Sequence, residues 1–304
     1  MTVKTPPRPN AAQRLERRVA TLTIWGPTVG TAAAIAWSAT AGVSALELGL
    51  LAGFYALTML GITAGYHRHF THRSFQAHPA VRWVLGALGA MAAQGPVLFW
   101  VAAHRRHHQH ADGPGDPHSP WTGDETPRGG LAGFWHAHVG WMLRHAPDDW
   151  LRTVPDLLRD DVAMGLNQTY FHWIALGLAA PALIGALATQ SWQGALGGFL
   201  WGGCVRLFLV HHATWLVNSW CHMLGARPHD TADRSTNAFA CAVLTFGEGW
   251  HNNHHAVPAS ARHGWTWRQP DPTWALIRTL ERLGLASRVI TPPTPTTAPE
   301  EQAS

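Results

Sequence analysis

Long stretches without a charged residue constrain this chain more than any other feature of its sequence. No Asp, Glu, Lys or Arg occurs in residues 19–40, in residues 48–66 or in the 44 residues 162–205. A polar break at 189–194 divides the last stretch, and a helix of about 20 apolar residues crosses the roughly 30 Å hydrocarbon core of a membrane. The sequence therefore predicts an all-α integral membrane protein with four transmembrane helices in two hairpins, at about 19–40, 48–66, 170–188 and 195–216.

The loops inside the two predicted hairpins carry no Lys or Arg, which predicts the orientation of the chain. Because Lys and Arg are enriched in cytoplasmic loops, we expect the N-terminal segment 1–18, the middle of the chain and both termini to be cytoplasmic. We expect a single membrane domain over 19–290 and a disordered, Pro/Thr-rich tail over 291–304. A fifth apolar stretch, 83–103, is expected to form a helix that lies in the membrane interface or dips in and back.

The composition is consistent with a membrane protein. Charged residues make up 13% of the chain, about half the roughly 25% of an average soluble domain. The 17 Trp outnumber the 10 Phe and 3 Tyr, and Trp favours membrane interfaces. The net charge of +4 is modest and the Arg residues are scattered, so we expect no nucleic-acid partner.

Histidine is the most informative residue type, because the 21 His exceed the 18 Asp and Glu together. Four motifs stand out, namely H-x-x-x-x-H, N-x-x-x-H and H-x-x-H-H twice. They contain His67, His72, His104, His107, His108, Asn218, His222, His251, His254 and His255. Since positions i, i+3 and i+4 share a helix face, each H-x-x-H-H is expected to aim three imidazoles at one point. The five-residue spacing of His67 and His72 suits a helix end or two different metals.

Imidazole binds iron, copper, nickel or zinc without adding charge. A tetrahedral zinc site takes four ligands, so nine clustered histidines are too many for one ion and suit two. The motifs follow the cytoplasmic ends of predicted spans, which predicts a dimetal site just below the membrane on the cytoplasmic side. Isolated histidines, including His118 and His263, are expected to be ordinary surface or core residues. His211 and His212 either line a cavity in the membrane or belong to an extension of their helix beyond it.

Carboxylates are too few for the soluble type of di-iron site. Soluble di-iron bundles use two E-x-x-H motifs and two further Glu, whereas this chain has one such motif, Glu248 to His251. Asp112, Asp116 and Glu248 are instead candidates to orient the imidazoles from behind.

Taken together, these motifs resemble the membrane-bound acyl desaturases, especially the stearoyl-CoA desaturase type and its bacterial Δ9 relatives. The resemblance covers about residues 60–285 and includes the segments 62–68, 116–118, 138–141 and 214–219. It implies four transmembrane helices below a cytosolic cap that holds two irons in a bacterial cell membrane. It implies the nine clustered histidines as ligands, with Asn218 reaching one metal through a water. It also implies an acyl tunnel lined by Trp100, Thr214 and Trp215, with Arg144 near the head group.

The activity that the resemblance implies is an O₂-dependent desaturation. Two electrons and O₂ would convert a saturated acyl chain into a cis, Δ9-unsaturated one, with the di-iron centre itself as catalyst and no separate acid or base. The acyl carrier is coenzyme A, an acyl-carrier protein or a membrane lipid; Ala102 and Ala103 replace the Arg-Asp pair that helps to hold coenzyme A in the animal enzymes. No flavin or nicotinamide motif is visible, so we expect a separate ferredoxin or cytochrome b5 type donor with its reductase.

Two alternatives use the same histidines. A related hydroxylase or a decarboxylase that forms terminal alkenes would share the metal centre, although the match over Thr214–Ser219 favours desaturation. A non-enzymatic metal transporter or sensor would place its ligands in broken helices at the middle of the membrane. Most histidines of this chain lie instead in the predicted cytoplasmic regions.

Overall fold

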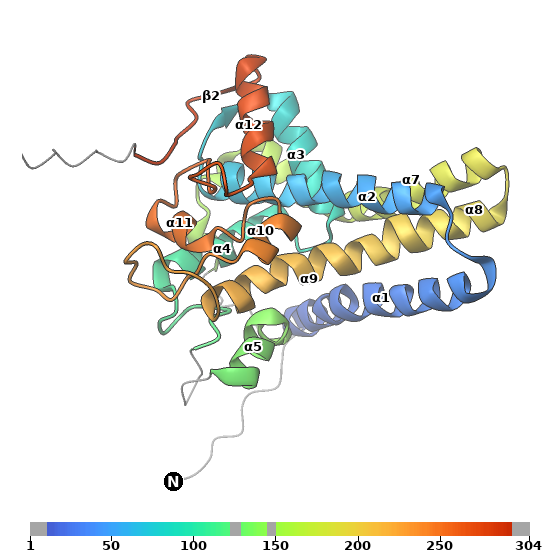
Figure 1. Ribbon diagram of the computed structural model, residues 1–304, viewed down its shortest axis with the longest axis horizontal. Coiled ribbons are helices and arrows are strands. Elements are labelled where there is room, and N and C mark those ends of the chain that lie inside the picture. Colours follow the sequence, from blue (N-terminus) through green and yellow to red (C-terminus); the bar gives the residue numbers. More distant parts are fainter. Residues whose placement is uncertain (1–10, 122–128, 145–149, 294–304) are drawn as a thin grey trace, which may run out of the picture.

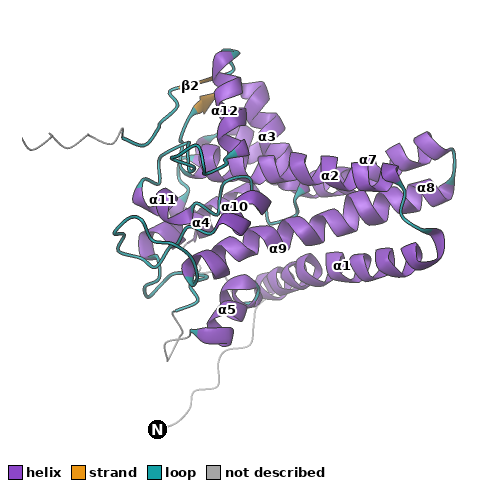
Figure 2. Ribbon diagram, viewed as in Figure 1, coloured by secondary structure: helices purple, strands orange, loops and turns teal. Residues whose placement is uncertain are grey.

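The computed structural model describes residues 11–121, 129–144 and 150–293, and most of these are helical (Figures 1 and 2). Within the described residues, four helices are long and apolar enough to cross a membrane. They run over Gln13–Ala41, Ala45–Thr71, Tyr170–Thr189 and Trp192–His222. The predicted fold class, an all-α membrane protein with four such helices, is therefore confirmed. In Figure 1 they lie side by side along the long axis, and each pair is connected at the right-hand end.

Each membrane-length helix is built from one or more helical elements. The first hairpin comprises α1 (Ala11–Ala41), α2 (Ala45–Leu60) and the π-helix η1 (Gly61–Thr71). The second comprises α7 (Tyr170–Thr189), α8 (Trp192–Gly197), the π-helix η5 (Gly198–Val205), α9 (Arg206–Ser219) and the short turn η6 (Trp220–His222). Because α1 begins at Ala11, the end of the segment expected over 1–18 is already helical; its first ten residues lie outside the described ones.

Local sequence explains where α2 begins and how closely the helices pack. Ser44 and Glu47 form a reciprocal capping box, in which Glu47 accepts from the Ser44 N–H at 2.6 Å. Glycines allow close contact: a Cβ at Gly61 would lie 2.2 Å from the Gly89 nitrogen, and one at Gly198 would lie 2.1 Å from the Pro181 oxygen. Small residues at such crossings let helix backbones approach in a membrane.

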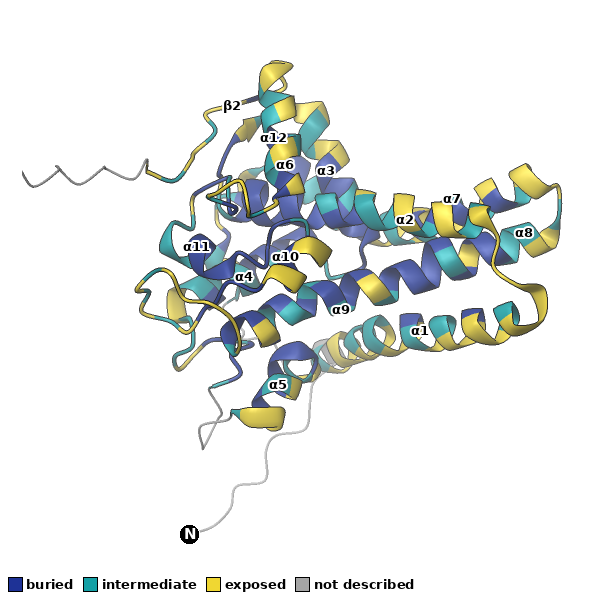
Figure 3. Ribbon diagram, in the orientation of Figure 1, coloured by how far each residue is buried: buried dark blue, intermediate teal, exposed yellow. Residues whose placement is uncertain are grey.

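The helix from Trp192 to His222 is the central one. In the most apolar segment of this helix, 61% of the residues are buried within the protein. The corresponding buried share is 11% for Gln13–Ala41 and 17% for Tyr170–Thr189. Figure 3 shows the same contrast between a largely buried α9 and an α1 with many exposed positions. The exposed apolar side chains of the outer helices are what a lipid-facing surface requires.

Shorter helices gather at one end of the four long ones and form the cap (Figure 1). They are α3 (Pro79–Met91), α4 (Val97–His110), α5 (Gly130–His138), η2 (Gly140–Leu143), η3 (Trp150–Thr153), η4 (Leu157–Arg159), α6 (Asp161–Gln168), α10 (Phe239–Leu244), α11 (His251–Ala256) and α12 (Pro272–Arg282). Two-residue strands β1 (Gln76–Ala77) and β2 (Ala286–Ser287) pair antiparallel, with Gln76 opposite Ser287. The tail expected to be disordered lies outside the described residues from 294 onward.

The apolar stretch 83–103 is not the single helix that the sequence suggested. It forms α3 and α4, which have 13 and 14 residues and are separated by a break at 92–96. Gly95 in this break has a φ of +106°, a conformation that glycine adopts without strain. Two side chains of α9 hold the backbone here: Arg206 donates to the Met91 carbonyl and His211 to the Ala92 carbonyl, both at 2.7 Å. The dipeptide Gly95-Pro96 was the sequence signal for this break.

Candidate metal centre

Nine histidines from four segments of the chain converge in the cap and form two adjacent groups. The ring nitrogens within each group lie within 4.8 Å of one another. The five-histidine group consists of His67, His72, His104, His108 and His254, and the four-histidine group consists of His107, His222, His251 and His255. The contributing elements are η1 with its C-terminal residue, α4, η6 and α11.

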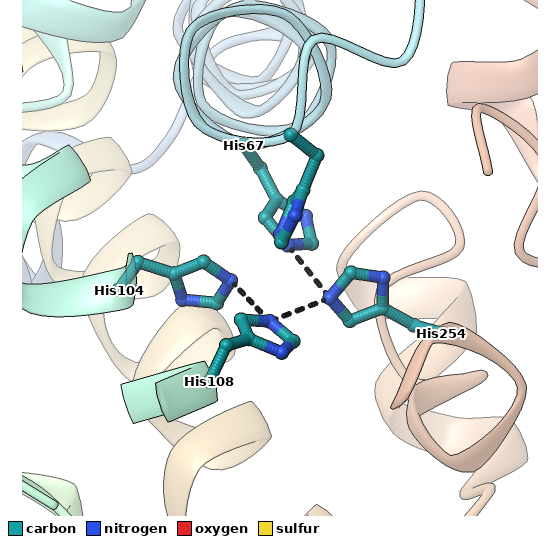
Figure 4. Close-up of side chains that lie close together, drawn as sticks. His67, His104, His108 and His254 are labelled. Atoms are coloured by element: carbon teal, nitrogen blue, oxygen red, sulfur yellow. Dashed lines mark hydrogen bonds between the residues drawn. The ribbon is translucent and has the colours of Figure 1, made fainter. Parts of the chain in front are cut away.

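Figure 4 shows four members of the five-histidine group, His67, His104, His108 and His254, with their rings turned toward one another. Nε2 of His254 lies 3.2 Å from that of His67 and 3.0 Å from that of His108. His108 and His104 lie 3.1 Å apart through the same atoms. His72 completes the group with a buried Nε2 that makes no hydrogen bond within the described residues.

The four-histidine group repeats this arrangement. Nε2 of His251 lies 3.0 Å from that of His222 and 3.1 Å from that of His255. His107 approaches His255 at 3.4 Å. Nitrogens bound at about 2.1 Å to one ion lie roughly 3.0–3.4 Å from each other, so the spacing in both groups fits metal ligands.

Each H-x-x-H-H motif is divided between the two groups, so the expectation of three imidazoles aimed at one point is wrong. From α4, His104 and His108 enter the five-histidine group and His107 enters the other. From α11, His251 and His255 belong to the four-histidine group, and His254 belongs to the five-histidine group. The physical reason is that i+3 and i+4 lie on opposite sides of position i, about 100° apart, so that one helix can present side chains to both groups.

The π-helix η1 explains why His67 and His72 belong to the same group. The N–H of His72 donates to the carbonyl of His67 at 3.2 Å, which is the i to i+5 bond of a π-helix. Residues i and i+5 therefore lie roughly one above the other here, and the two rings lie 4.8 Å apart between centroids. The sequence had left two different metals open for this pair, and the structure places both rings in the five-histidine group.

Four carboxylates hold the outer nitrogens of four histidines. Nδ1–H of His67 donates to Glu248 at 2.6 Å, that of His107 to Asp116 at 2.9 Å, that of His222 to Asp112 at 2.8 Å and that of His255 to Asp233 at 2.8 Å. Such partners fix the tautomer and orientation of a ligating imidazole, so that Nε2 presents its lone pair to the centre. Each group receives at least one of these orienting carboxylates.

Glu248 is held by a buried ion-pair network. Arg68 donates to Glu248 from Nε and Nη2 at 3.2 and 3.0 Å, and its Nη1 donates to Asp271 at 3.1 Å. Burial alone would raise the pKa of Glu248, but Arg68, His67 and His263 together outweigh it and hold that pKa well below the usual range. The carboxylate that orients His67 is therefore ionised.

Burial also keeps the histidines in the form that binds metals. Desolvation, followed by repulsion from neighbouring histidines, lowers the pKa of six of them well below the ordinary 6.5. These are His72, His104, His108, His251, His254 and His255. A neutral imidazole keeps the lone pair that a metal needs, so these six histidines favour ligation at neutral pH.

The other residues singled out from the sequence lie at different distances from the centre. Trp100 stacks on His104, with ring centroids 5.1 Å apart. Thr214 accepts a hydrogen bond from Gln94 at 2.8 Å, and Trp215 is buried against His138. Asn218 lies on α9 four residues before His222 and makes no side-chain hydrogen bond within the described residues. Arg144 is exposed at the end of η2.

Sequence reasoning missed three residues that lie against the centre. Asp233 orients His255 from 22 positions away, in a loop with no motif. His263 is fully buried, with Nδ1 3.2 Å from Glu248, and His118 stacks on His107 at 4.4 Å. His118 belongs to the Asp-Pro-His segment at 116–118, which was the available signal for it. His211 and His212 lie in the central helix outside both groups; His212 pairs with His138 at 3.0 Å.

Comparison with known proteins agrees with this geometry. An acetylenase of Moorena producens, named for hex-5-enoyl-[acyl-carrier protein], is 46% identical over 261 residues, which are 85% of this chain and 81% of that protein. The sn-1 stearoyl-lipid 9-desaturase of Anabaena variabilis is 43% identical over 235 residues, 76% and 78% of the two chains. The chloroplastic palmitoyl-monogalactosyldiacylglycerol delta-7 desaturase of Arabidopsis thaliana is 39% identical over 79% of this chain and 61% of that protein. A family model described as fatty acid desaturase matches residues 46–279, and the chain belongs to that family of oxidoreductases.

Proposed function

We propose that this protein is a membrane desaturase that introduces a cis double bond, at Δ9, into a saturated acyl chain. The observation that carries the proposal is the pair of histidine groups, whose inner nitrogens converge at the end of a membrane-length helix bundle. The 43% identity to a stearoyl-lipid 9-desaturase supports both the reaction and the position of the double bond.

The residues fit two iron ions. Both groups offer only imidazole nitrogen, at spacings that suit a shared ion, with ionised carboxylates behind the rings. Iron bound there would use O₂, two electrons and two protons to remove two hydrogens from adjacent methylenes and release two waters, which no side chain can do alone. We propose the nine histidines as ligands, with Asn218 acting through a water beside His222.

The surrounding side chains position the acyl chain and exclude water. Trp100 lies between the five-histidine group and an apolar core, packing on His104 and edge-on to Tyr66. The hydrogen bond from Gln94 to Thr214 ties the break between α3 and α4 to α9. We assign Trp100, Thr214 and Trp215 to the wall of the acyl site and Arg144 to its head-group end. A fixed wall places one carbon–carbon bond beside the metals.

The proposal includes an orientation and a second protein. Hairpin loops that lack Lys and Arg support a cap, metal centre and termini on the cytoplasmic side of a bacterial cell membrane. Two electrons per turnover would come from a ferredoxin or cytochrome b5 type carrier with its reductase.

A second candidate is the formation of a triple bond. The acetylenase at 46% identity favours it, because that protein is named for an acyl chain on an acyl-carrier protein that already holds a double bond. The same centre would then remove two hydrogens from an unsaturated rather than a saturated pair of carbons. The two candidates differ in substrate, and product analysis separates them.

The test is acyl-chain profiling by mass spectrometry, with localisation of the new bond, in a host that lacks aerobic desaturation. We would express the wild type with a ferredoxin and its reductase, beside H254A from the five-histidine group and H107A from the other. H110A is the matched control, because His110 lies on α4 in neither group and is exposed.

A new Δ9 monounsaturated chain in the wild type and in H110A, absent from both other variants, is the expected result. A triple bond with the same dependence would select the second candidate. Hydroxylated chains or terminal alkenes would replace desaturation by the related chemistries. An unchanged product in H254A and H107A would refute the assignment of the histidines.

A further inference from the structure

The end of the cap that lies farthest from the hairpin connections is built from two loops that flank α11. One loop comprises residues 223–238 and the other residues 257–271, and Figure 1 shows them at the left, opposite the α1–α2 and α7–α8 connections. The two loops touch, because the ring of His229 lies 4.3 Å from that of Trp265. Together with Trp121 they form what we call the arginine–tryptophan face, which contains Trp121, Arg227, Arg234, Trp265, Trp267 and Arg268.

This face is basic. Arg227, Arg234 and Arg268 are exposed, and none of them pairs with a carboxylate of the described residues. The acidic side chains of the two loops are mostly engaged elsewhere. Asp233 accepts from His255, and Asp271 is buried with Arg68, which leaves Asp230 as the exposed acidic residue of the two loops.

The face also exposes aromatic surface that a monomer has little reason to expose. Trp267 is 85% exposed, and the Arg268 guanidinium lies 5.0 Å from the centre of its ring. The Arg234 guanidinium lies 4.2 Å above the ring of Trp121. Arg and Trp are enriched where proteins bind one another, and they dominate the binding energy of such interfaces.

Short connections join this face to the four-histidine group. Nε1–H of Trp121 donates to the carbonyl of His222 at 2.8 Å. On the loop 223–238, Asp233 accepts a hydrogen bond from His255. The backbone N–H of Arg234 on this loop donates to Asp112, the carboxylate that orients His222. A protein bound on the arginine–tryptophan face would therefore be one layer of residues away from two proposed ligands.

We infer that this face docks an acidic protein that carries single electrons. The inference rests on the proposed function, which consumes two electrons per turnover at a centre buried in the cap. A one-electron carrier must dock twice in each turnover, reduced on arrival and oxidised on departure. Contacts of this kind are small, transient and guided by opposite charges, which matches a compact basic face with exposed Trp.

The test reverses the charges of two arginines whose side chains do not hold the loops together. R234E/R268E is chosen because, among the described residues, these guanidinium groups contact only Trp rings, whereas Arg227 donates to carbonyls of its own loop and is left in place. R159E/R282E is the matched control, since both residues are exposed in other parts of the cap. The full-length, metal-loaded protein in nanodiscs is titrated with two acidic probes, a plant-type [2Fe–2S] ferredoxin and the soluble domain of cytochrome b5.

Binding of the oxidised probes is measured first, because it needs no turnover and so does not depend on the acyl substrate. We expect the Kd of at least one probe to rise by about tenfold or more in R234E/R268E at low salt, and the difference to shrink at high salt. The control should change less than about twofold. Product formation driven by dithionite, which needs no docking, should be the same in all three proteins.

Two results would overturn the inference: binding of neither probe to the wild type, or equal loss of binding in both variants. Failure of the proposed function looks different. In that case no acyl product forms with dithionite in any of the proteins, while the probes still distinguish R234E/R268E from its control.

Discussion

The Arg68 guanidinium lies 3.0 Å from the Glu248 carboxylate, and both side chains are buried. Glu248 accepts the Nδ1 hydrogen of His67 through its other oxygen. A buried cation thus fixes a buried anion, which fixes an imidazole of the five-histidine group. The four-histidine group has its own orienting carboxylates, so the two proposed metal sites should respond separately to changes behind their histidines.

E248Q should weaken metal binding in the five-histidine group by about 10- to 100-fold, because the orienting charge is lost. D112N, behind His222, should do the same in the four-histidine group only. Metal content per chain across a chelator series gives the affinities, and Mössbauer spectra of ⁵⁷Fe-loaded protein distinguish the two ions. Equal losses from both groups in either variant would contradict separate control.

The loop that carries Asp233 allows a second test of the same idea. D233N removes the charged acceptor of His255 and should weaken the four-histidine group by about tenfold or more. D230N is the control, because Asp230 is exposed three residues earlier on the same loop. The measurement is the chelator concentration that removes half of the metal. If D230N were to release metal as readily as D233N, the effect would belong to the loop as a whole.

Sequence reasoning reached the parts of this structure that leave a local pattern. Charge-free runs located the four membrane-length helices, and the histidine spacing located the residues that converge in the cap. The contact between Asp233 and His255 leaves no such pattern, since it depends on how the loop 223–238 folds over α11. The sequence also did not predict that each H-x-x-H-H motif is divided between the two groups. The spacing gives the helix face of each histidine, but not how the helices are placed relative to one another.

The hydroxyl of Thr214 should help to hold the break between α3 and α4 in place, because it accepts a hydrogen bond from Gln94. T214V leaves Nε2 of Gln94 without its acceptor, which should cost about 1–2 kcal/mol of stability. Because this bond ties the break to α9, we also expect lower activity and a mixture of double-bond positions. T214S keeps the hydroxyl and should retain a single product. Localisation of the double bond by mass spectrometry decides the matter, and one product position in T214V would speak against the assignment.

Acid should loosen the cap at Asp156. Both oxygens of Asp156 accept from Arg105, at 2.6 and 2.9 Å, and Arg73 pairs with it as well. Burial would raise the pKa of Asp156, but these hydrogen bonds outweigh it and hold that pKa below the usual 3.8. A lowered pKa in the folded state means that the stabilisation is complete well above the unfolded value of about 3.9 and is lost as pH falls.

D156N should therefore be less stable than the wild type at pH 7, by about 1 kcal/mol because solvent screens this partly exposed pair. The difference should narrow as pH falls from about 5 toward 3, because the carboxylate of the unfolded wild type takes up its proton at a higher pH than that of the folded protein. Thermal unfolding in detergent at a series of pH values measures both variants on the same scale. A gap that stays constant or widens in acid would show that Asp156 contributes through packing rather than through its charge.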